Sequence, residues 1–189
     1  MISDPTESDV RVTPGLILDR DGVIHREIGY LHQSHQVEFT PGIFDLCREA
    51  RARGYRIIIV TNQAGIGRGL YPEESFHALM RWILERFAEE RAPIDGYYYC
   101  PHHPIHGVGK YQVDCPDRKP HPGMILRAAR DHSLDLSQSI LIGDRCSDLS
   151  AGAAAGIPQL FLFKGTETGI CEGASFESLS ELRALIPRL

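Results

Sequence analysis

The stretch Tyr-Arg-Ile-Ile-Ile-Val-Thr-Asn at residues 55–62 indicates the class of fold. Its continuous β-branched centre predicts a strand that is covered on both faces, as the strands of parallel sheets are. Two other short apolar runs, at residues 15–18 and 139–142, predict further buried strands. The sequence therefore predicts a sheet with helices on both of its faces.

Helical segments separate the predicted strands along the chain. The clearest one opens at Pro72 and carries apolar residues at helical spacing from Phe76 to Phe87. Thr40-Pro41-Gly42 has the pattern of a helix start, with Thr40 as the capping residue. We further expect strands at 96–99 and 159–163, and helices from about 122, at 147–155 and at 179–185. This alternation predicts one doubly wound α/β domain with a mostly parallel sheet over residues 14–189, preceded by a disordered tail at residues 1–13.

The composition is that of an ordinary globular protein. Of the 189 residues, 42% are hydrophobic and 24% are charged, and 20 Lys+Arg against 25 Asp+Glu give a net charge of −5. This mild acidity argues against nucleic-acid binding and against a polybasic membrane anchor, since both need a strongly positive surface. No apolar run approaches the roughly 18 residues of a membrane span, and the first ten residues lack the pattern of a signal peptide. Five scattered cysteines do not form a disulfide framework, so we expect the protein in the reducing cytoplasm. We also expect a monomer.

Polar side chains gather after three of the predicted strands, at the edge where parallel sheets bind ligands. They are Asp19 and Asp21 after the first strand, Thr61, Asn62 and Gln63 after the second, Asp144, Arg145 and Asp148 after the fourth, and Arg118 and Lys119 in the loop before it. Taken singly, each of these patterns is more often a turn or a helix cap than a site. Their combination at one edge of the sheet indicates a functional site.

The charges of this set suit phosphoryl transfer, which needs neutralisation and alignment of charged groups. The oxygens of Asp19 and Asp144, with the backbone carbonyl of Asp21, are hard ligands that suit Mg²⁺. In this interpretation Asp19 is the nucleophile and forms an acyl phosphate. Asp21 protonates the leaving alcohol and then deprotonates the attacking water. Lys119 and the Thr61 hydroxyl neutralise the transferring phosphoryl group.

Four segments resemble the motifs of the haloacid dehalogenase (HAD) superfamily of aspartate-nucleophile phosphatases. They are Asp19-Arg-Asp-Gly-Val23, Thr61-Asn62, Lys119 and Gly143-Asp144-x-x-x-Asp148. Residues 61–69, 98–104 and 118–124 look like the D-glycero-D-manno-heptose 1,7-bisphosphate 7-phosphatase branch, a relative of the histidinol-phosphate phosphatase domain. The resemblance implies a Rossmann-like HAD fold and a Mg²⁺-dependent phosphomonoester hydrolase that removes the C7 phosphate of a heptose bisphosphate.

The same resemblance implies roles for single residues. Asp19 is the nucleophile and Asp21 the proton donor, while Thr61 and Lys119 stabilise the phosphoryl group. Mg²⁺ is expected on Asp19, Asp21 and Asp144, with Asp148 adjoining this ligand set. The expected substrate contacts are Glu27, Ile28, Gly29, Tyr30, Asn62, Gln63, Ala64, Arg118 and Arg145. The family usually has Ser where Ala64 stands, so this chain lacks a hydroxyl at that contact.

The loop at residues 100–117 has the pattern of a structural Zn²⁺ site. Cys100-Pro-His102 is followed by Cys115-Pro-Asp117, and two such pairs can close a tetrahedral site. The related family has Cys where Asp117 stands. The expected ligands are Cys100, His102, Cys115 and Asp117, with His103 or His106 as the alternative fourth ligand. The competing interpretation is a metal-free loop that packing and hydrogen bonds hold in place.

The spacing of the motifs leaves no room for the cap domain that many HAD phosphatases carry, so we expect an open, capless site. Three functions are compatible with the sequence. The first is a phosphatase acting on the heptose bisphosphate, and the second is a phosphatase of histidinol phosphate or another small sugar phosphate. The third is a non-catalytic binding protein on the same fold, which predicts a missing motif acid, and none is missing.

Overall fold

The computed structural model describes residues 12–163 and 174–185, in which six strands form one parallel sheet. The strands are β1 (Thr13–Leu18), β2 (Arg56–Asn62), β3 (Gly96–Cys100), β4 (Leu134–Gly143), β5 (Gln159–Phe163) and β6 (Ala174–Phe176). Their order across the sheet is β3-β2-β1-β4-β5-β6, and each neighbouring pair is parallel. The predicted α/β fold is confirmed. Most of the predicted disordered tail, residues 1–11, lies outside the described residues, and its last residue, Thr13, instead begins β1.

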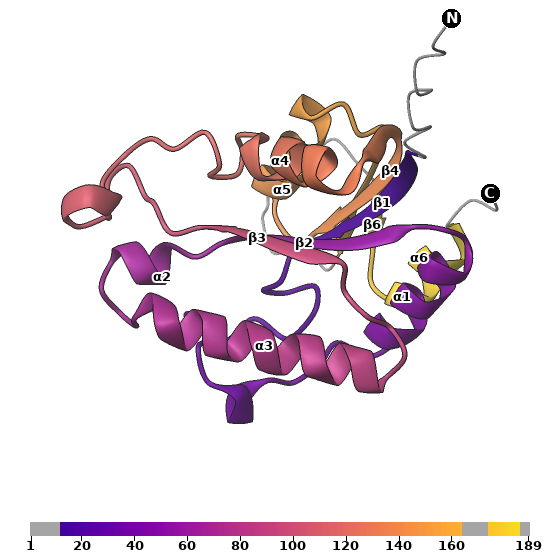
Figure 1. The fold of residues 1–189 in the computed structure, drawn as a ribbon, viewed down its shortest axis with the longest axis horizontal. Coiled ribbons are helices and arrows are strands. Elements are labelled where there is room, and N and C mark those ends of the chain that lie inside the picture. The colour runs from indigo at the N-terminus through magenta and orange to yellow at the C-terminus, as the bar shows by residue number, and fades with distance from the viewer. Residues whose placement is uncertain (1–11, 164–173, 186–189) are drawn as a thin grey trace, which may run out of the picture.

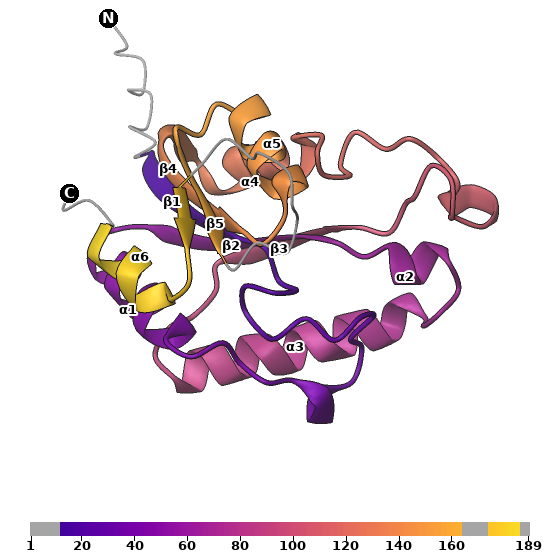
Figure 2. The same cartoon turned by 180° about the vertical axis from the view of Figure 1, so that it is seen from behind.

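Helices cover both faces of this sheet. They are α1 (Ile43–Ala52), α2 (Ala64–Gly67), α3 (Glu73–Glu89), α4 (Gly123–His132), α5 (Cys146–Ala154) and α6 (Leu179–Leu185), with short 3₁₀ turns η1 (Ser34–Gln36) and η2 (Gly109–Tyr111). Figure 1 shows α1, α3 and α6 on one side of the sheet and α4 and α5 on the other, and Figure 2 shows the same two layers from behind. The doubly wound arrangement follows from this.

The apolar run of β2 feeds two separate hydrophobic clusters. Ile57 and Ile59 pack in the cluster that contains the buried residues of α1 and α3, while Ile58 and Val60 pack in the cluster that contains those of α4. All four side chains are at most 1% exposed. Successive residues of a strand point to opposite faces, so a strand with two covered faces needs apolar residues at every position.

The starts of α1 and β4 differ from those expected, because the backbone conformation sets them rather than the side-chain pattern. Helix α1 begins at Ile43, and its N-cap is Gly42 with φ +86° and no side-chain cap, so Thr40 does not cap it through its hydroxyl. Strand β4 begins at Leu134, before the apolar run, and its register against β1 shifts between Pro14 and Leu16. Ser139 bridges the shift, since its hydroxyl accepts a hydrogen bond from the Gly15 N–H at 2.8 Å.

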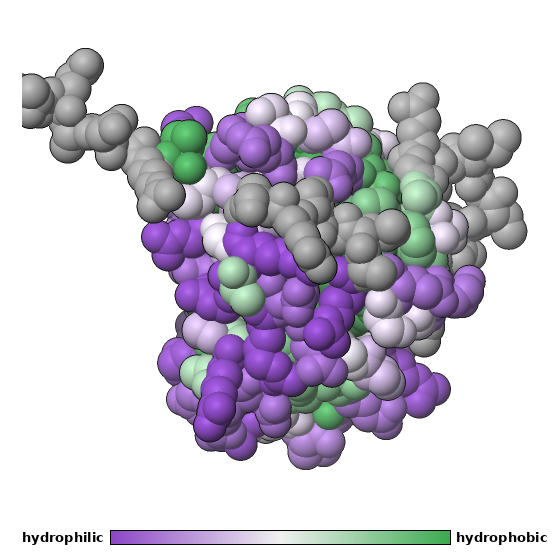
Figure 3. Space-filling view, turned by 90° about the vertical axis from the view of Figure 1, so that its right-hand side faces the viewer, coloured by the Kyte–Doolittle hydropathy of each residue, from purple (hydrophilic) through white to green (hydrophobic). Residues whose placement is uncertain are grey.

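The loops at the carboxyl ends of β1, β2 and β3 gather at the end of the molecule that carries α2 and the loop after β3 (Figures 1 and 2). Among the described residues, the connections that follow these strands consist of loops, short 3₁₀ turns and the helices α1 to α4 rather than an added domain. Figure 3 views the other end, beside α1 and α6, where the visible described surface is mostly hydrophilic with small hydrophobic patches. Within the described part of the chain, no helix is long and apolar enough to cross a membrane.

Candidate active site

A cavity of about 600 Å³ opens at the carboxyl ends of β1, β2 and β4. Most of the expected site residues line it, namely Asp19, Asp21, Glu27, Gly29, Tyr30, Thr61, Asn62, Gln63, Ala64, Arg118, Lys119, Arg145 and Asp148. Ile28 is absent from the lining and is 44% exposed on its loop. Asp144 is also absent from the lining, because it is buried behind it at 5% exposure.

Lys119 places a buried ammonium group between two carboxylates. Its Nζ lies 2.6 Å from Asp19 Oδ1 and 2.6 Å from Asp148 Oδ1, and it donates to the Val60 carbonyl at 2.9 Å. Burial opposes the charged form, but Asp148 and Asp19 outweigh it and raise the pKa of Lys119 above its usual value. The ammonium therefore stays charged at neutral pH.

Asp19, Asp144 and Asp148 form one cluster, with one ligand atom from each within 4.8 Å of the others. Asp148 is fully engaged, because its Oδ1 pairs with Lys119 and its Oδ2 accepts from the Arg145 N–H at 3.0 Å. Asp144 Oδ1 is buried without a hydrogen-bond partner. Burial, together with Asp148, raises the pKa of Asp144 to about 7, and burial raises the pKa of Asp19 well above its ordinary value despite Lys119. This concentration of acid calls for a further cation.

Gly22 explains how the loop after β1 approaches this cluster. Its φ is +87°, and a Cβ atom at this position would lie 2.2 Å from Asp144 Oδ2. Any side chain there would therefore strain the backbone and displace the Asp144 carboxylate. The glycine that follows Asp21 is thus required by the close contact between β1 and β4.

Asp21 directs its carboxylate toward Arg20, Gln63 and Thr61 rather than toward the acidic cluster, so only its backbone carbonyl remains to serve a metal ion. The Arg20 guanidinium contacts both of its oxygens, at 3.1 Å from Nε and 2.8 Å from Nη2. Gln63 donates to Asp21 Oδ2 at 2.8 Å, and Thr61 donates to the same oxygen at 3.3 Å. Burial acts in the opposite direction, yet Arg20 and then His25 hold the pKa of Asp21 below its usual range.

Asn62 and Gln63 have positioning contacts that their expected role as substrate contacts did not include. Asn62 binds the backbone of Lys119 twice, donating to its carbonyl at 3.0 Å and accepting from its N–H at 3.1 Å. Gln63 is 2% exposed, and its Oε1 accepts hydrogen bonds from Arg20 and from the Tyr71 hydroxyl. These two amides fix Lys119 and Asp21 relative to β2.

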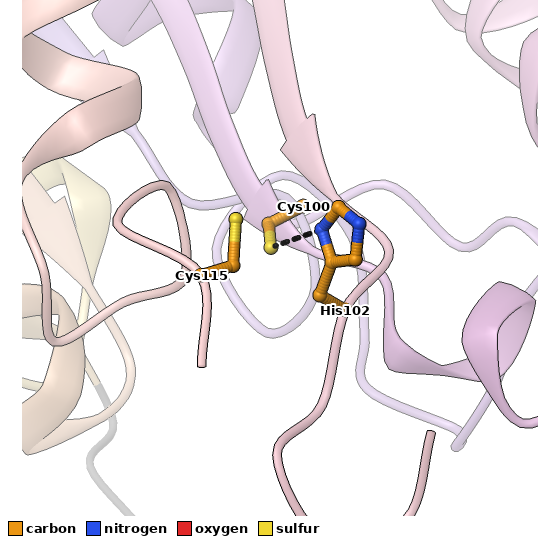
Figure 4. Close-up of side chains that lie close together, drawn as sticks. All are labelled: Cys100, His102 and Cys115. Carbon is orange, nitrogen blue, oxygen red and sulfur yellow. Dashed lines mark hydrogen bonds between the residues drawn. The ribbon is translucent and has the colours of Figure 1, made fainter. Parts of the chain in front are cut away.

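The cysteine loop brings three of its four expected ligands together. Figure 4 shows the side chains of Cys100, His102 and Cys115 turned toward one another, and their ligand atoms lie within 4.8 Å of each other. The Cys100 thiol contacts His102 Nδ1 at 3.7 Å, and burial raises its pKa to about 12. Asp117 does not join them, which corrects the expected set. Its carboxylate instead accepts a hydrogen bond from Arg127 at 2.7 Å.

His103 is also turned away from that cluster. Its Nδ1 accepts hydrogen bonds from the backbone N–H groups of Ile105 and His106, at 3.2 and 3.1 Å. The described residues thus supply two sulfur atoms and one imidazole to this group, and neither Asp117 nor His103 completes it.

Comparison with known proteins decides the family. A D-glycero-alpha-D-manno-heptose-1,7-bisphosphate 7-phosphatase of Burkholderia mallei is 48% identical over 174 residues, covering 92% of each chain. A D-glycero-beta-D-manno-heptose-1,7-bisphosphate 7-phosphatase of Vibrio cholerae is 43% identical, covering 76% of this chain and 77% of its own. The chain belongs to the heptose-1,7-bisphosphate 7-phosphatase family. It is a phosphatase.

Solved structures and a family model place the chain among the HAD phosphatases. The HAD-hydrolase-like family model matches residues 117–177. A HAD-like phosphatase of Mesorhizobium loti superposes with a TM-score of 0.84 at 34% identity, covering 93% of this chain and 85% of its own. The D,D-heptose 1,7-bisphosphate phosphatase of B. bronchiseptica, solved in complex with magnesium and phosphate, superposes with a TM-score of 0.76 at 25% identity, covering 92% of this chain and 97% of its own.

Three residues of this phosphatase that the sequence reasoning did not single out belong to the site. Arg20 is 1% exposed and holds Asp21, while Tyr71 holds Gln63. Arg68 lines the outer part of the cavity. Arg20 could have been predicted, because a basic residue between two acids at the end of a buried strand can pair with a neighbouring acid. Arg68 and Tyr71 have no sequence pattern that distinguishes them from ordinary loop residues.

Proposed function

We propose that this phosphatase removes the C7 phosphate of D-glycero-D-manno-heptose 1,7-bisphosphate through a phosphoenzyme on Asp19. The observation that carries the proposal is the buried Lys119 ammonium, which Asp19 and Asp148 share, together with the buried Asp144 oxygen that has no hydrogen-bond partner. Such a site neutralises a transferring phosphoryl group, which is the main requirement of this chemistry. The names of the relatives support the substrate.

We propose Mg²⁺ as the cofactor, since the residues present fit it. Asp19 and Asp144 would hold the ion together with the backbone carbonyl of Asp21, because Asp148 already uses both of its oxygens on Lys119 and the Arg145 N–H. Oxygen ligands of this kind are those that Mg²⁺ prefers. A bound Mg²⁺ neutralises charge on the phosphate and keeps Asp19 ionised. The related B. bronchiseptica phosphatase was solved with magnesium and phosphate.

In the first half of the reaction an Asp19 carboxylate oxygen attacks phosphorus. The P–O bond to C7 breaks, and Asp21 gives its proton to the leaving oxygen. Arg20 lowers the pKa of Asp21 after burial has raised it, and a phosphate dianion beside Asp21 opposes Arg20 and favours the protonated acid. Lys119 and the Thr61 hydroxyl face the cavity and bind the phosphoryl oxygens.

In the second half a water molecule attacks the aspartyl phosphate. Asp21 takes the proton of this water, the P–O bond to Asp19 breaks, and inorganic phosphate leaves. The open cavity admits this water directly. Both carboxylic residues are thereby returned to their starting state, which makes Asp21 an acid in one half-reaction and a base in the other.

A panel of phosphate esters assayed with Mg²⁺ tests the substrate. We expect kcat/KM on the heptose 1,7-bisphosphate to exceed that on histidinol phosphate by at least about 10-fold, and the reverse order would favour the histidinol-phosphate function. Asp19→Asn tests the nucleophile, and we expect it to lower kcat by more than about 10³-fold. Asp45→Asn, at an exposed position of α1, is the matched control and should keep the parental rate. Phosphate release by Asp19→Asn at that rate would refute the mechanism.

We also propose that Cys100, His102 and Cys115 hold a structural Zn²⁺, since two thiolates and an imidazole are preferred zinc ligands. Arg118 supports this role for the loop, because its guanidinium donates to the His102 carbonyl at 3.0 Å and so follows the position of this cluster. Elemental analysis of the purified protein tests the proposal. We expect about one zinc per chain and its loss in Cys115→Ser. A stoichiometry near zero in the parent would leave a metal-free loop.

A further inference from the structure

Two arginines that line the cavity have no carboxylate partner among the described residues. Lys119 is paired with two acids and Arg20 with one. Arg145 lies 3.7 Å from Glu27 and 3.9 Å from Asp144. Arg68 and Arg118 also line the cavity, and within residues 12–163 and 174–185 neither has a carboxylate within 4.0 Å. Unneutralised arginines in a pocket favour a second anionic group on the ligand.

Arg68 is held in place without losing its charge. Its guanidinium carbon lies 5.3 Å from the centre of the Tyr30 ring, and its Nη1 donates a hydrogen bond to the Tyr30 hydroxyl. A tyrosine face attracts the cation but accepts few of its five N–H donors. The remaining donors are therefore available for a planar, two-point contact with a phosphate, the geometry that arginine provides and lysine does not.

The backbone beneath Arg68 is tightly packed, which makes its position reproducible. Gly67 accepts a hydrogen bond from the Val108 N–H at 2.8 Å, and a Cβ atom on Gly67 would lie 2.3 Å from the Pro101 carbonyl oxygen. A Cβ atom on Gly65 would lie 2.3 Å from the Tyr71 ring. Helix α2 is thus wedged between Tyr71 and the loop after β3, and Arg68 extends from its end.

His103 connects Arg68 with Arg118. It lines the same cavity, and its pKa is lowered first by burial and then by the charges of Arg118, His106 and Arg68. Arg68, His103 and Arg118 therefore line one cavity together, and the charges of both arginines act on the imidazole between them in the chain.

We propose that Arg68, stacked on Tyr30, is a specificity-determining residue that binds the phosphate which the reaction leaves in place. This inference rests on the proposed function and deepens it. Arg118 provides a second cation for the same phosphate. A substrate with two phosphates contacts both the buried Lys119 and the exposed Arg68, whereas a monophosphate contacts Lys119 alone. Arg68 thus contributes binding energy before and during the reaction equally, which lowers KM and leaves kcat unchanged.

The test compares two substrates in one enzyme, the heptose 1,7-bisphosphate and the heptose 7-phosphate. Arg68→Gln removes the charge at nearly constant length, and Arg68→Lys keeps the charge but removes the planar fork. For Arg68→Gln we expect kcat/KM on the bisphosphate to fall between about 10- and 100-fold, mostly through KM, and to change less than about 2-fold on the monophosphate. Arg68→Lys should fall between parent and Arg68→Gln. Arg130→Gln, an exposed residue near the end of α4 outside the cavity, should leave both values unchanged.

Each outcome decides the matter. An equal loss on both substrates would assign Arg68 a merely structural role and overturn the proposal, as would an unchanged bisphosphate value. Either result leaves the proposed function intact as long as the parent prefers the bisphosphate. A parent with equal kcat/KM on the two substrates would overturn the proposed function and this inference together, so the two failures are distinguishable.

Discussion

Replacing Lys119 with Met should destabilise the protein in a way that depends on pH. The ammonium lies 2.6 Å from each of two carboxylates that are at most 9% exposed, so its loss leaves two acids facing each other in the interior. Breaking a buried ion pair from one side costs about 3–5 kcal/mol, and the shared geometry places Lys119→Met at the upper end of that range.

The sign of the pH dependence follows from Asp19. Its pKa is already raised by burial despite Lys119, and the loss of Lys119 raises it further. A carboxyl whose pKa is higher in the folded than in the unfolded state loses stability as pH rises above the unfolded value of about 3.9. The deficit of Lys119→Met relative to the parent should therefore be larger at pH 8 than at pH 5.

Urea unfolding in EDTA at these two pH values measures the deficit. Lys110→Met is the control, because Lys110 is exposed and its Nζ lies 5.0 Å from the centre of the Tyr111 ring, and it should cost less than about 1 kcal/mol. Adding Asp148→Asn to Lys119→Met should restore part of the stability, since one of the opposed charges is removed. A deficit below about 1 kcal/mol at pH 8, or one that is equal at both pH values, would refute this account of the buried charges.

Three further outcomes are expected. Because the pKa of Asp144 is raised to about 7, protons compete with Mg²⁺ below that pH, and the increase in Tm on replacing EDTA by Mg²⁺ should grow from pH 5.5 to pH 8.5 in thermal melts; a constant increase would contradict it. Gly67→Ala should cost about 1–3 kcal/mol in urea unfolding, because its Cβ meets the Pro101 carbonyl oxygen at 2.3 Å, and a neutral effect would show that α2 is loosely packed. Asp95→Ala should cost about 2 kcal/mol in the same assay with kcat unchanged, since Asp95 accepts from Arg51 at 2.7 Å far from the cavity; a changed kcat would contradict its purely structural role.

The sequence predicted the strands in which nearly every residue is buried. The β-branched run of β2 and the short run of β1 are fully buried, and apolar composition alone identifies such strands. Once those strands are parallel neighbours, their carboxyl ends share one edge, so Asp19 and Thr61 come together without further information. Parallel topology is therefore what made the floor of the site predictable.

Very short elements and the directions of single side chains could not be predicted in this way. Strand β6 has three residues and α2 has four, too few for a hydrophobic period to appear. The orientation of Asp117 depends on Arg127, ten positions later on α4, and no local pattern links the two residues. The loop after β3 was recognised by its ligand types, whereas the direction of each side chain depends on tertiary packing.

The position of Arg20 joins Asp21, the proposed catalytic acid, to the hydrophobic interior. Its guanidinium binds the Asp21 carboxylate on one side and lies 5.5 Å from the centre of the fully buried Phe76 ring on the other. A small shift of α3 would therefore move the Arg20 guanidinium and, with it, the Asp21 carboxylate. Substitutions in the core beneath α3 should consequently lower the catalytic rate before they lower the stability of the fold. In related sequences, the core positions that change most slowly should therefore lie close to Asp21 rather than be spread evenly through the core.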